Sequence, residues 1–253
     1  MNQAYFQFHT NLNYFLPPEK QHHLFAHKIY DDASIKDTIE AIGVPHPEID
    51  VILVNGQAVD FSYIVQAEDV VKIYPLFTTF EVAPTVRVGP SSLLEARFVL
   101  DAHLGRLASY LRRLGFDVLY RNDYEDAELA RISSEETRIL LTRDLGLLKR
   151  SLVTYGYFVR SVNPEEQVLE LIRRFQLLPQ IKPFTRCARC NGLLHPVQKE
   201  AIIDRLSAQT RQEYEEFQLC NDCDQIYWRG SHVERIEAWI QWVYEQVEDA
   251  SQP

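Results

Sequence analysis

Residues 97–150 read RFVLDAHLGRLASYLRRLGFDVLYRNDYEDAELARISSEETRILLTRDLGLLKR. Three short apolar runs, at 98–100, 116–120 and 139–142, are separated by segments whose apolar residues recur at helical spacing. Strands that alternate with helices of this length are typical of βαβ units, and consecutive βαβ units build a parallel sheet. The stretch therefore predicts an α/β fold for the middle of the chain.

Carboxylates follow each of the three predicted strands. Asp101 comes directly after the first, Asp123 and Asp126 follow the second, and Asp144 follows the third. In open α/β sheets, functional groups gather beyond the carboxyl ends of the strands. Carboxylates that converge there repel one another unless a cation neutralises them, and hard oxygen ligands suit Mg²⁺ or Mn²⁺. Such ions could activate a water for in-line attack on phosphorus.

A simpler interpretation is that these aspartates only cap helices. Asp101 and Asp144 both precede helix-like segments, and aspartate is a preferred N-cap residue. The spacing alone favours neither interpretation. Cations that could contact a phosphate backbone also lie in this stretch, although such charges are usually a solvated helix face. They are Arg106, Arg112, Arg113, Arg121, Arg143, Lys149 and Arg150.

The overall composition sets broad limits on the class of protein. The 253 residues carry a formal net charge of −10, which argues against a general polyanion binder but leaves room for a local basic patch. No apolar run reaches the roughly 18 residues of a membrane span, and MNQAYFQFHTNLNYF lacks the features of a secretory signal. We therefore expect a soluble cytoplasmic protein of more than one domain, with no membrane partner.

The first 78 residues predict a small α+β module. Alternation at 4–8 indicates a strand, and Ser34 is suited to cap a short helix. The apolar run 51–54 is followed by Asn55-Gly56, a strong hairpin signal, and 70–74 forms a last strand.

This layout, with its VNG turn and the segment AEDVVKIYP, resembles the ubiquitin-like sulfur-carrier fold. Such carriers act through a free C-terminal Gly-Gly pair, whereas this chain continues through Pro75 and Leu76 without one. The residues therefore favour a docking or folding module.

Proline, glycine and serine mark 79–96 as a linker, and the α/β core is expected over 97–180. Past Asp144, a helix is predicted at 145–153 and a fourth strand at 157–160. Asn163-Pro164-Glu165-Glu166 then has the N-cap, N1 and N3 residues of a strong helix start.

The four cysteines form two pairs within the segment 181–253. Cys187-x-x-Cys190 and Cys220-x-x-Cys223 could each give two thiolates to one tetrahedral Zn²⁺. Four thiolates leave no open position, so this zinc would be structural. Free buried pairs or a redox motif are the alternatives, but a redox motif would need only one pair.

A polar helical insert is expected between the two pairs, and a helix with one apolar face is expected after them. Tyr227 and Trp228, just past the second pair, could stack on unpaired bases. Aromatic residues beside a zinc knuckle also commonly form a small core.

DAHLGRLASYLRRLGFDVLY, followed by ILLTRD, closely resembles the mutator-seven C-terminal RNase domain family, a branch of the PIN-like nucleases. The TRD triplet after an apolar strand is typical of PIN domains. The resemblance covers about 97–240, where YWRGSH is similar to the signature of the family's zinc ribbon, and residues 1–78 resemble the ubiquitin-like domain that often precedes it. It implies a PIN-like three-layer α/β/α parallel sheet and metal-dependent cleavage of RNA.

Carried over residue by residue, the resemblance implies that Asp101 and Asp144 bind Mg²⁺ or Mn²⁺. For the metal ligand between these two in the sequence, after the second predicted strand, Asp123 and Asp126 are the alternatives, and Glu128 is a weaker third option. The candidate substrate contacts are Arg106, Arg112, Arg143 and Lys149.

RNA is the expected partner, including tRNA or another structured RNA, and the N-terminal module could bind a protein. Two other functions stay open. One is a non-catalytic RNA-binding or ribosome-associated adaptor, in which the carboxylates are caps. The other is an interaction scaffold built on the N-terminal module.

Overall fold

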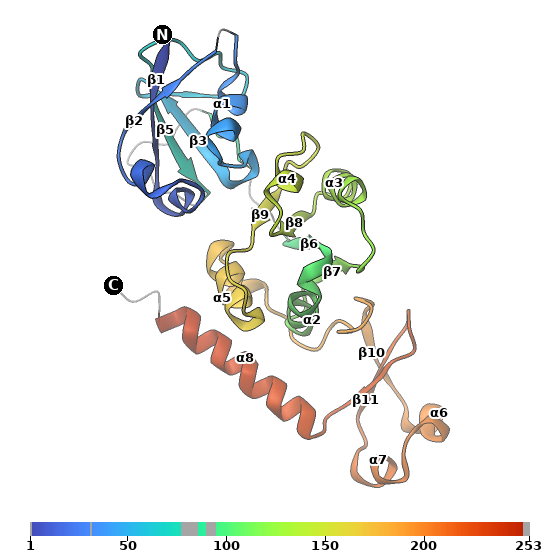
Figure 1. Cartoon of the computed structure of the whole chain (residues 1–253). Coiled ribbons are helices and arrows are strands. Elements are labelled where there is room, and N and C mark those ends of the chain that lie inside the picture. The colour runs from blue at the N-terminus through green and yellow to red at the C-terminus, as the bar shows by residue number, and fades with distance from the viewer. Residues whose placement is uncertain (1, 31, 77–85, 90–94, 250–253) are drawn as a thin grey trace. The chain divides into compact units, whose positions relative to one another are not determined.

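A computed structural model describes residues 2–30, 32–76, 86–89 and 95–249 (Figure 1). Most of the expected linker at 79–96 lies outside these residues. The chain forms two compact units, one with residues 1–94 and 125–158 and the other with 95–124 and 159–253. The division into four sequence segments therefore stays a prediction.

A five-stranded sheet with the order β2-β1-β5-β3-β4 forms the N-terminal module. Its strands are β1 (Gln3–Phe8), β2 (Phe25–Lys28), β3 (Ile49–Val54), β4 (Gln57–Val59) and β5 (Val70–Pro75). β1 and β5 run parallel, and the other pairs are antiparallel. Asn55 and Gly56 both adopt positive φ in the turn between β3 and β4, so the predicted hairpin is confirmed.

One α-helix packs on this sheet, as the sequence predicts. α1 (Ile35–Ile42) begins after Ser34, whose hydroxyl oxygen accepts a hydrogen bond from the amide of Asp37. Its buried residues Ile35 and Ile39 join the hydrophobic core formed by the sheet. Three 3₁₀ helices complete the module: η1 (Thr10–Phe15), η2 (Pro18–Lys20) and η3 (His46–Glu48).

The predicted parallel sheet is confirmed, with the order β7-β6-β8-β9. Its strands are β6 (Arg97–Leu100), β7 (Asp117–Tyr120), β8 (Ile139–Thr142) and β9 (Gly156–Phe158). β7 pairs in parallel with β6, and β9 pairs in parallel with β8. Every residue of β8 is buried, as expected for a parallel strand covered on both faces.

Helices flank these strands, at positions close to those predicted. They are η4 (Ala102–Leu104), α2 (Gly105–Arg113), α3 (Asp126–Glu135), α4 (Leu145–Leu148), α5 (Pro164–Arg174) and η5 (Leu178–Gln180). Asn163 caps α5 by accepting the amides of Glu165 and Glu166, so the predicted start is confirmed. The helix predicted at 145–153 instead ends at Leu148, because residues 150–153 form a turn that leads into β9.

The C-terminal part begins with a three-stranded antiparallel sheet. β11 (Phe217–Cys220) lies between β10 (Leu194–Val197) and β12 (Ile226–Trp228). The insert between β10 and β11 is helical, as predicted, with α6 (Lys199–Ile202), η6 (Ile203–Arg205) and α7 (Ala208–Glu213).

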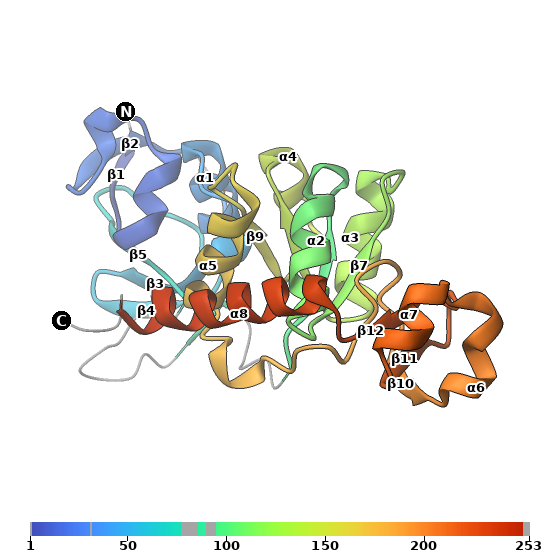
Figure 2. The same ribbon diagram turned by 90° about the horizontal axis from the view of Figure 1, so that it is seen from below.

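The last helix, α8 (Ser231–Asp249), lies along α5 (Figure 2). Its residues Ile240, Val243 and Val247 are buried, and Arg173 of α5 donates to the carbonyl of Gln246. The prediction that this helix covers an apolar surface is therefore confirmed. Among the described residues, no helix is both long enough and apolar enough to cross a membrane.

The N-terminal module shares its compact unit with the segment from α3 to β9. The carboxylate of Glu48, which is fully buried, accepts the amide of Phe158 in β9 at 2.8 Å. Nε2 of His46 lies 2.7 Å from the carbonyl of Val153, and Lys149 donates to the carbonyl of Glu40 at 2.7 Å. These polar contacts fasten η3 to β9 and to the turn before it, and α1 to the end of α4.

We expect Glu48→Ala to destabilise the protein by about 1–3 kcal/mol, because the buried amide of Phe158 would lose its acceptor. Urea denaturation followed by circular dichroism measures this loss. Glu48→Gln is the matched control, since its amide oxygen can still accept the bond. Equal unfolding midpoints for Glu48→Ala and the wild type would contradict the assigned role.

Candidate functional site

Asp101 is the first predicted site residue, and it lies directly after β6. The residue is 6% exposed, and Oδ1 accepts a hydrogen bond from the amide of Ala102 at 2.6 Å as the N-cap of η4. Oδ2 lies 3.0 Å from Nε2 of His103, an exposed side chain. The carboxylate is therefore held in one orientation by its own turn.

Tyr120 at the end of β7 supports this turn. Its hydroxyl donates to the carbonyl of Ala102 at 2.8 Å. A Cβ at position 105 would lie only 2.6 Å from that hydroxyl, so any larger residue would displace the tyrosine from its place at the start of α2. In the sequence DAHLG, Asp101 therefore caps η4, and Gly105 leaves room for the side chain of Tyr120 from the neighbouring strand β7.

Asp144 has the corresponding place after β8, and its side chain is exposed. Its Oδ1 accepts the amides of Gly146 at 2.6 Å and Leu147 at 3.3 Å, so it caps α4. Its own amide donates to the hydroxyl of Thr142 at 2.9 Å. The TRD triplet therefore forms a small hydrogen-bonded turn that fixes the direction of the carboxylate.

The two candidates for the middle position differ in their surroundings. Asp123 is exposed and 2.9 Å from Nε of Arg121, whose hydrogen bond lowers the pKa of this carboxyl. Asp126 begins α3, 3.5 Å from the guanidinium of Arg150. Glu128, the third option, lies in the first turn of the same helix.

The four aspartates divide evenly between the compact units. Asp101 and Asp123 belong to one unit, and Asp126 and Asp144 belong to the other. Their convergence on a metal ion stays a prediction.

Three of the four candidate substrate contacts lie at or near the surface. Arg106 is exposed on α2, Arg143 lies over the ring of Phe158 at 5.9 Å, and Lys149 donates to the N-terminal module as described. Contact with RNA stays a prediction for these residues.

The structure corrects the prediction that Arg112 is a substrate contact. This side chain is 4% exposed, and Nε and Nη2 both donate to the carbonyl of Val118, at 3.1 and 2.9 Å. Nη1 donates to the carbonyl of Arg189 at 2.9 Å and that of Ala188 at 3.4 Å. Because its guanidinium is buried and donates to three backbone carbonyls, the structure does not present Arg112 to a phosphate backbone.

The sequence held a signal for this burial. Arg112 is four residues after Ala108 and eight after Leu104, on the same stripe of α2 that the apolar residues define. Burial lowers the pKa of the guanidinium, while nearby Cys190 and Cys187 raise it.

Asn191 is a further structural residue that the sequence interpretation missed. Its side chain accepts the amide of Val118 at 2.9 Å and donates to Asp117 at 2.8 Å. It adopts a φ of 77°, a conformation that asparagine tolerates better than most residues. Arg112 and Asn191 together fasten the first cysteine pair to β7.

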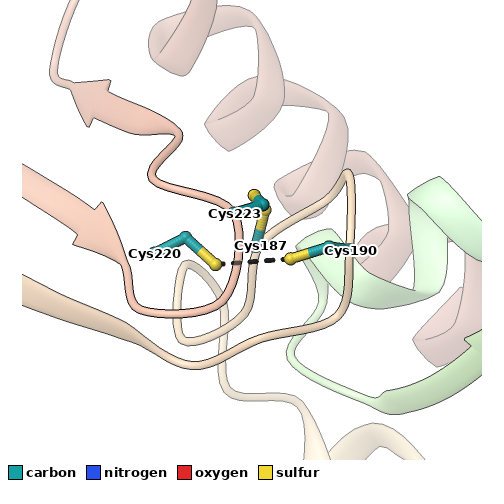
Figure 3. A group of neighbouring side chains, drawn as sticks. All are labelled: Cys187, Cys190, Cys220 and Cys223. Carbon is teal, nitrogen blue, oxygen red and sulfur yellow. Dashed lines mark hydrogen bonds between the residues drawn. The ribbon is translucent and has the colours of Figure 1, made fainter.

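The four cysteines converge, as Figure 3 shows. Their sulfur atoms all lie within 4.8 Å of one another, with Cys187 3.6 Å from Cys223 and Cys190 3.3 Å from Cys220. These separations are too long for disulfides and near the edge of about 3.8 Å that four Zn–S bonds of 2.3 Å imply. The quartet could therefore hold one structural Zn²⁺.

The two halves of the quartet have the same loop geometry. The amide of Asn191 donates to the carbonyl of Cys187, and the amide of Asp224 donates to that of Cys220. Both Asn191 and Asp224 have positive φ, and each follows the first cysteine of its pair by four residues. Each pair thus forms a knuckle that presents two thiols in the same way.

Tyr227 contacts the quartet directly, with its hydroxyl 3.0 Å from Sγ of Cys187. Burial raises the pKa of the Cys187 thiol, but hydrogen bonds from Tyr227 and from the amides of Cys190 and Arg189 lower it to about 7. Burial raises the pKa of Cys190 and of Cys223. Cys187 therefore becomes a thiolate, the form that binds metal, more readily than Cys190 or Cys223.

Two family models match the chain. Residues 96–240 match the Mut7-C RNAse domain, and residues 1–81 match the Mut7-C ubiquitin domain. The two matches have the order expected from the sequence. The comparisons with curated proteins and with solved structures found no match.

We expect the wild type to carry one zinc per chain and Cys190→Ser to lose it, measured by metal analysis after dialysis. Tyr227→Phe is the matched control, because it keeps all four thiols. Without the tyrosine hydroxyl, the pKa of Cys187 rises and protons compete better with the metal, so this variant should release zinc at a higher pH. Full zinc content in Cys190→Ser would contradict the assignment.

Proposed function

The chain belongs to the Mut7-C RNAse domain family, and from this premise we propose that it is a metal-dependent ribonuclease that hydrolyses RNA phosphodiester bonds. The observation that carries the proposal is the match over residues 96–240, a segment that contains all four candidate aspartates. The parallel sheet flanked by helices agrees with it.

Asp101 and Asp144 would hold Mg²⁺ or Mn²⁺, with Asp123 or Asp126 as a third ligand. Carboxylate oxygens are the ligands that these hard cations prefer. A bound ion would supply Lewis-acid activation of a water and neutralise charge at phosphorus.

The described turns support this role. Asp101 and Asp144 each accept backbone amides through Oδ1, and these bonds hold the carboxylates in a fixed orientation. A ligand that is already oriented loses less conformational freedom when a metal binds.

Arg106, Arg143 and Lys149 would steer the phosphate backbone. Each would offer a cation to phosphate on a chain whose total charge is acidic. The cysteine quartet would hold one structural Zn²⁺, and the N-terminal module would bind a protein partner. We place the protein in the cytoplasm, with tRNA or another structured RNA among its candidate substrates.

A second candidate is a non-catalytic RNA-binding or ribosome-associated adaptor. The observation that favours it is that both Asp101 and Asp144 act as helix caps, which is sufficient reason for an aspartate at each position. The two functions differ in what the negative charge contributes, and this difference can be tested.

Asp101→Asn and Asp144→Asn separate the two, because asparagine caps a helix about as well as aspartate but carries no charge. We expect each variant to lower the rate of Mn²⁺- or Mg²⁺-dependent cleavage about 100-fold or more, the scale on which loss of one stabilising group slows an enzyme. The substrate is a pool of structured and single-stranded RNAs. Asp204→Asn, an exposed change outside the candidate site, is the control.

Cleavage at the wild-type rate in both variants would contradict the proposed metal ligands. RNA binding without metal-dependent cleavage by the wild type would favour the adaptor. Asp123→Asn and Asp126→Asn are compared in the same assay. The variant with the larger loss of cleavage rate would identify which of the two residues is the third metal ligand.

A further inference from the structure

A pocket of about 810 Å³ lies in the C-terminal part of the chain. Its walls come from the first turns of α8, from β10, β11 and β12, and from the segments 184–188 and 214–216. Pockets that bind small ligands typically measure about 300 to 1,000 Å³, so this one has room for a nucleotide. The proposed metal sites make no use of it.

Aromatic side chains form much of the pocket wall: Phe184, Tyr214, Phe217, Tyr227 and Trp228. Trp228 is 38% exposed, a large fraction for this residue type. The rings of Trp228 and Tyr214 are 6.5 Å apart at a 44° tilt, so they are not stacked on each other. A flat ligand could therefore stack on either ring.

The position of one wall is tied to the cysteine quartet. Tyr227 lines the pocket, and its hydroxyl bonds to Cys187. Its ring is therefore held by the same knuckles that hold the four thiols together. Trp228 is the next residue of β12, so the bond between Tyr227 and Cys187 also holds the strand that carries Trp228.

Three arginines also line the pocket, together with acidic side chains. They are Arg113, Arg186 and Arg229, against the two acids Glu215 and Glu216. Lys199 Nζ lies 2.5 Å from the exposed carboxylate of Glu215, and Arg186 lies 3.5 Å from Asp117. The side chain of Arg229 is 72% exposed and pairs with Glu237, and such an exposed ion pair contributes little energy. The charges around the pocket therefore nearly balance, and the exposed Arg229 is the cation open to an anionic ligand.

We propose that this pocket binds an unpaired nucleotide of RNA, with the base stacked on Trp228 and the phosphates beside Arg229. Aromatic faces for bases and arginines for phosphates are the combination by which proteins hold single strands. The inference rests on RNA as the proposed substrate, and it adds a binding site separate from the carboxylates. An apolar segment of a protein could also enter such a pocket, but it would make no use of the exposed Arg229.

The test is binding of a fluorescein-labelled octauridylate to the full-length, zinc-loaded chain, followed by fluorescence anisotropy. The Asp144→Asn background and omission of Mg²⁺ and Mn²⁺ prevent cleavage, and no chelator is added, so zinc stays bound. We expect Trp228→Ala to weaken binding about tenfold or more, and Trp228→Phe to restore much of it, because phenylalanine can still stack. Tyr30→Ala, another exposed aromatic residue but outside the pocket, should bind as the parent does.

The arginines give a second measurement that does not depend on Trp228. For a single strand, each phosphate contact contributes about 0.7 to the slope of log affinity against log salt, so Arg229→Gln should lower the slope by about this amount. Arg131→Gln is the matched control, because Arg131 is also exposed and pairs with a glutamate on its own helix. A duplex of the same length should compete poorly, since its bases are not available for stacking.

The outcomes separate this inference from the proposed function. Binding that depends on Trp228 and Arg229 supports the pocket, even if the wild type cleaves no RNA. Cleavage by the wild type, together with unchanged binding in Trp228→Ala and Arg229→Gln, overturns the pocket and leaves the nuclease intact. Capture of an apolar peptide through Trp228, with no effect of these variants on RNA binding, would likewise overturn the proposal.

Discussion

The arrangement of the C-terminal part depends on one buried cation. Arg112 donates to Val118 in β7 and to Ala188 and Arg189 in the first knuckle, so a single guanidinium connects a helix, a strand and a cysteine loop. Burial of a charge is costly unless hydrogen bonds compensate for it, and here three backbone carbonyls do so. Asn191 adds a second connection to the same strand, through the amide of Val118. The position of the knuckle, and hence of the quartet and the pocket beside it, follows from these bonds.

The sequence predicted the strands, turns and helix starts that local residue patterns determine. Apolar runs located β6, β7 and β8, the hairpin signal located β3 and β4, and Asn163 marked the start of α5. It could not predict contacts between distant segments. The apolar stripe of α2 was a signal that Arg112 is buried, but its partners are backbone carbonyls, which have no sequence signature and could not be predicted. The helix at 145–153 looked longer than it is because its end is decided by the turn into β9 and by the bond between Val153 and His46. The place of each carboxylate after its strand was predictable, but whether the carboxylates converge was not.

The alternative roles of Asp101 and Asp144, cap and metal ligand, are compatible. In both residues Oδ1 accepts backbone amides, so the cap fixes the side chain through one of its two oxygens. A carboxylate has about four lone-pair sites, and capping uses only part of this capacity. The same bonds that begin η4 and α4 would therefore orient ligands for a cation. The start of each helix and the proposed metal site would then both require a carboxylate in the same orientation at Asp101 and Asp144.

The repeated knuckle geometry has a consequence for how the chain can vary. Each knuckle closes on its own hydrogen bonds, so the insert between them, α6, η6 and α7, contributes none of the four thiols. Doubling the length of a flexible loop costs only about 0.6 kcal/mol, so a change in the length of this insert would reach the metal site mainly through Arg205, which donates to the carbonyl of Asp224 in the second knuckle. Yet the same insert leads into Tyr214 and Glu215, which line the pocket. Drift in this one segment could change what the pocket recognises while the scaffold beneath it stays constant.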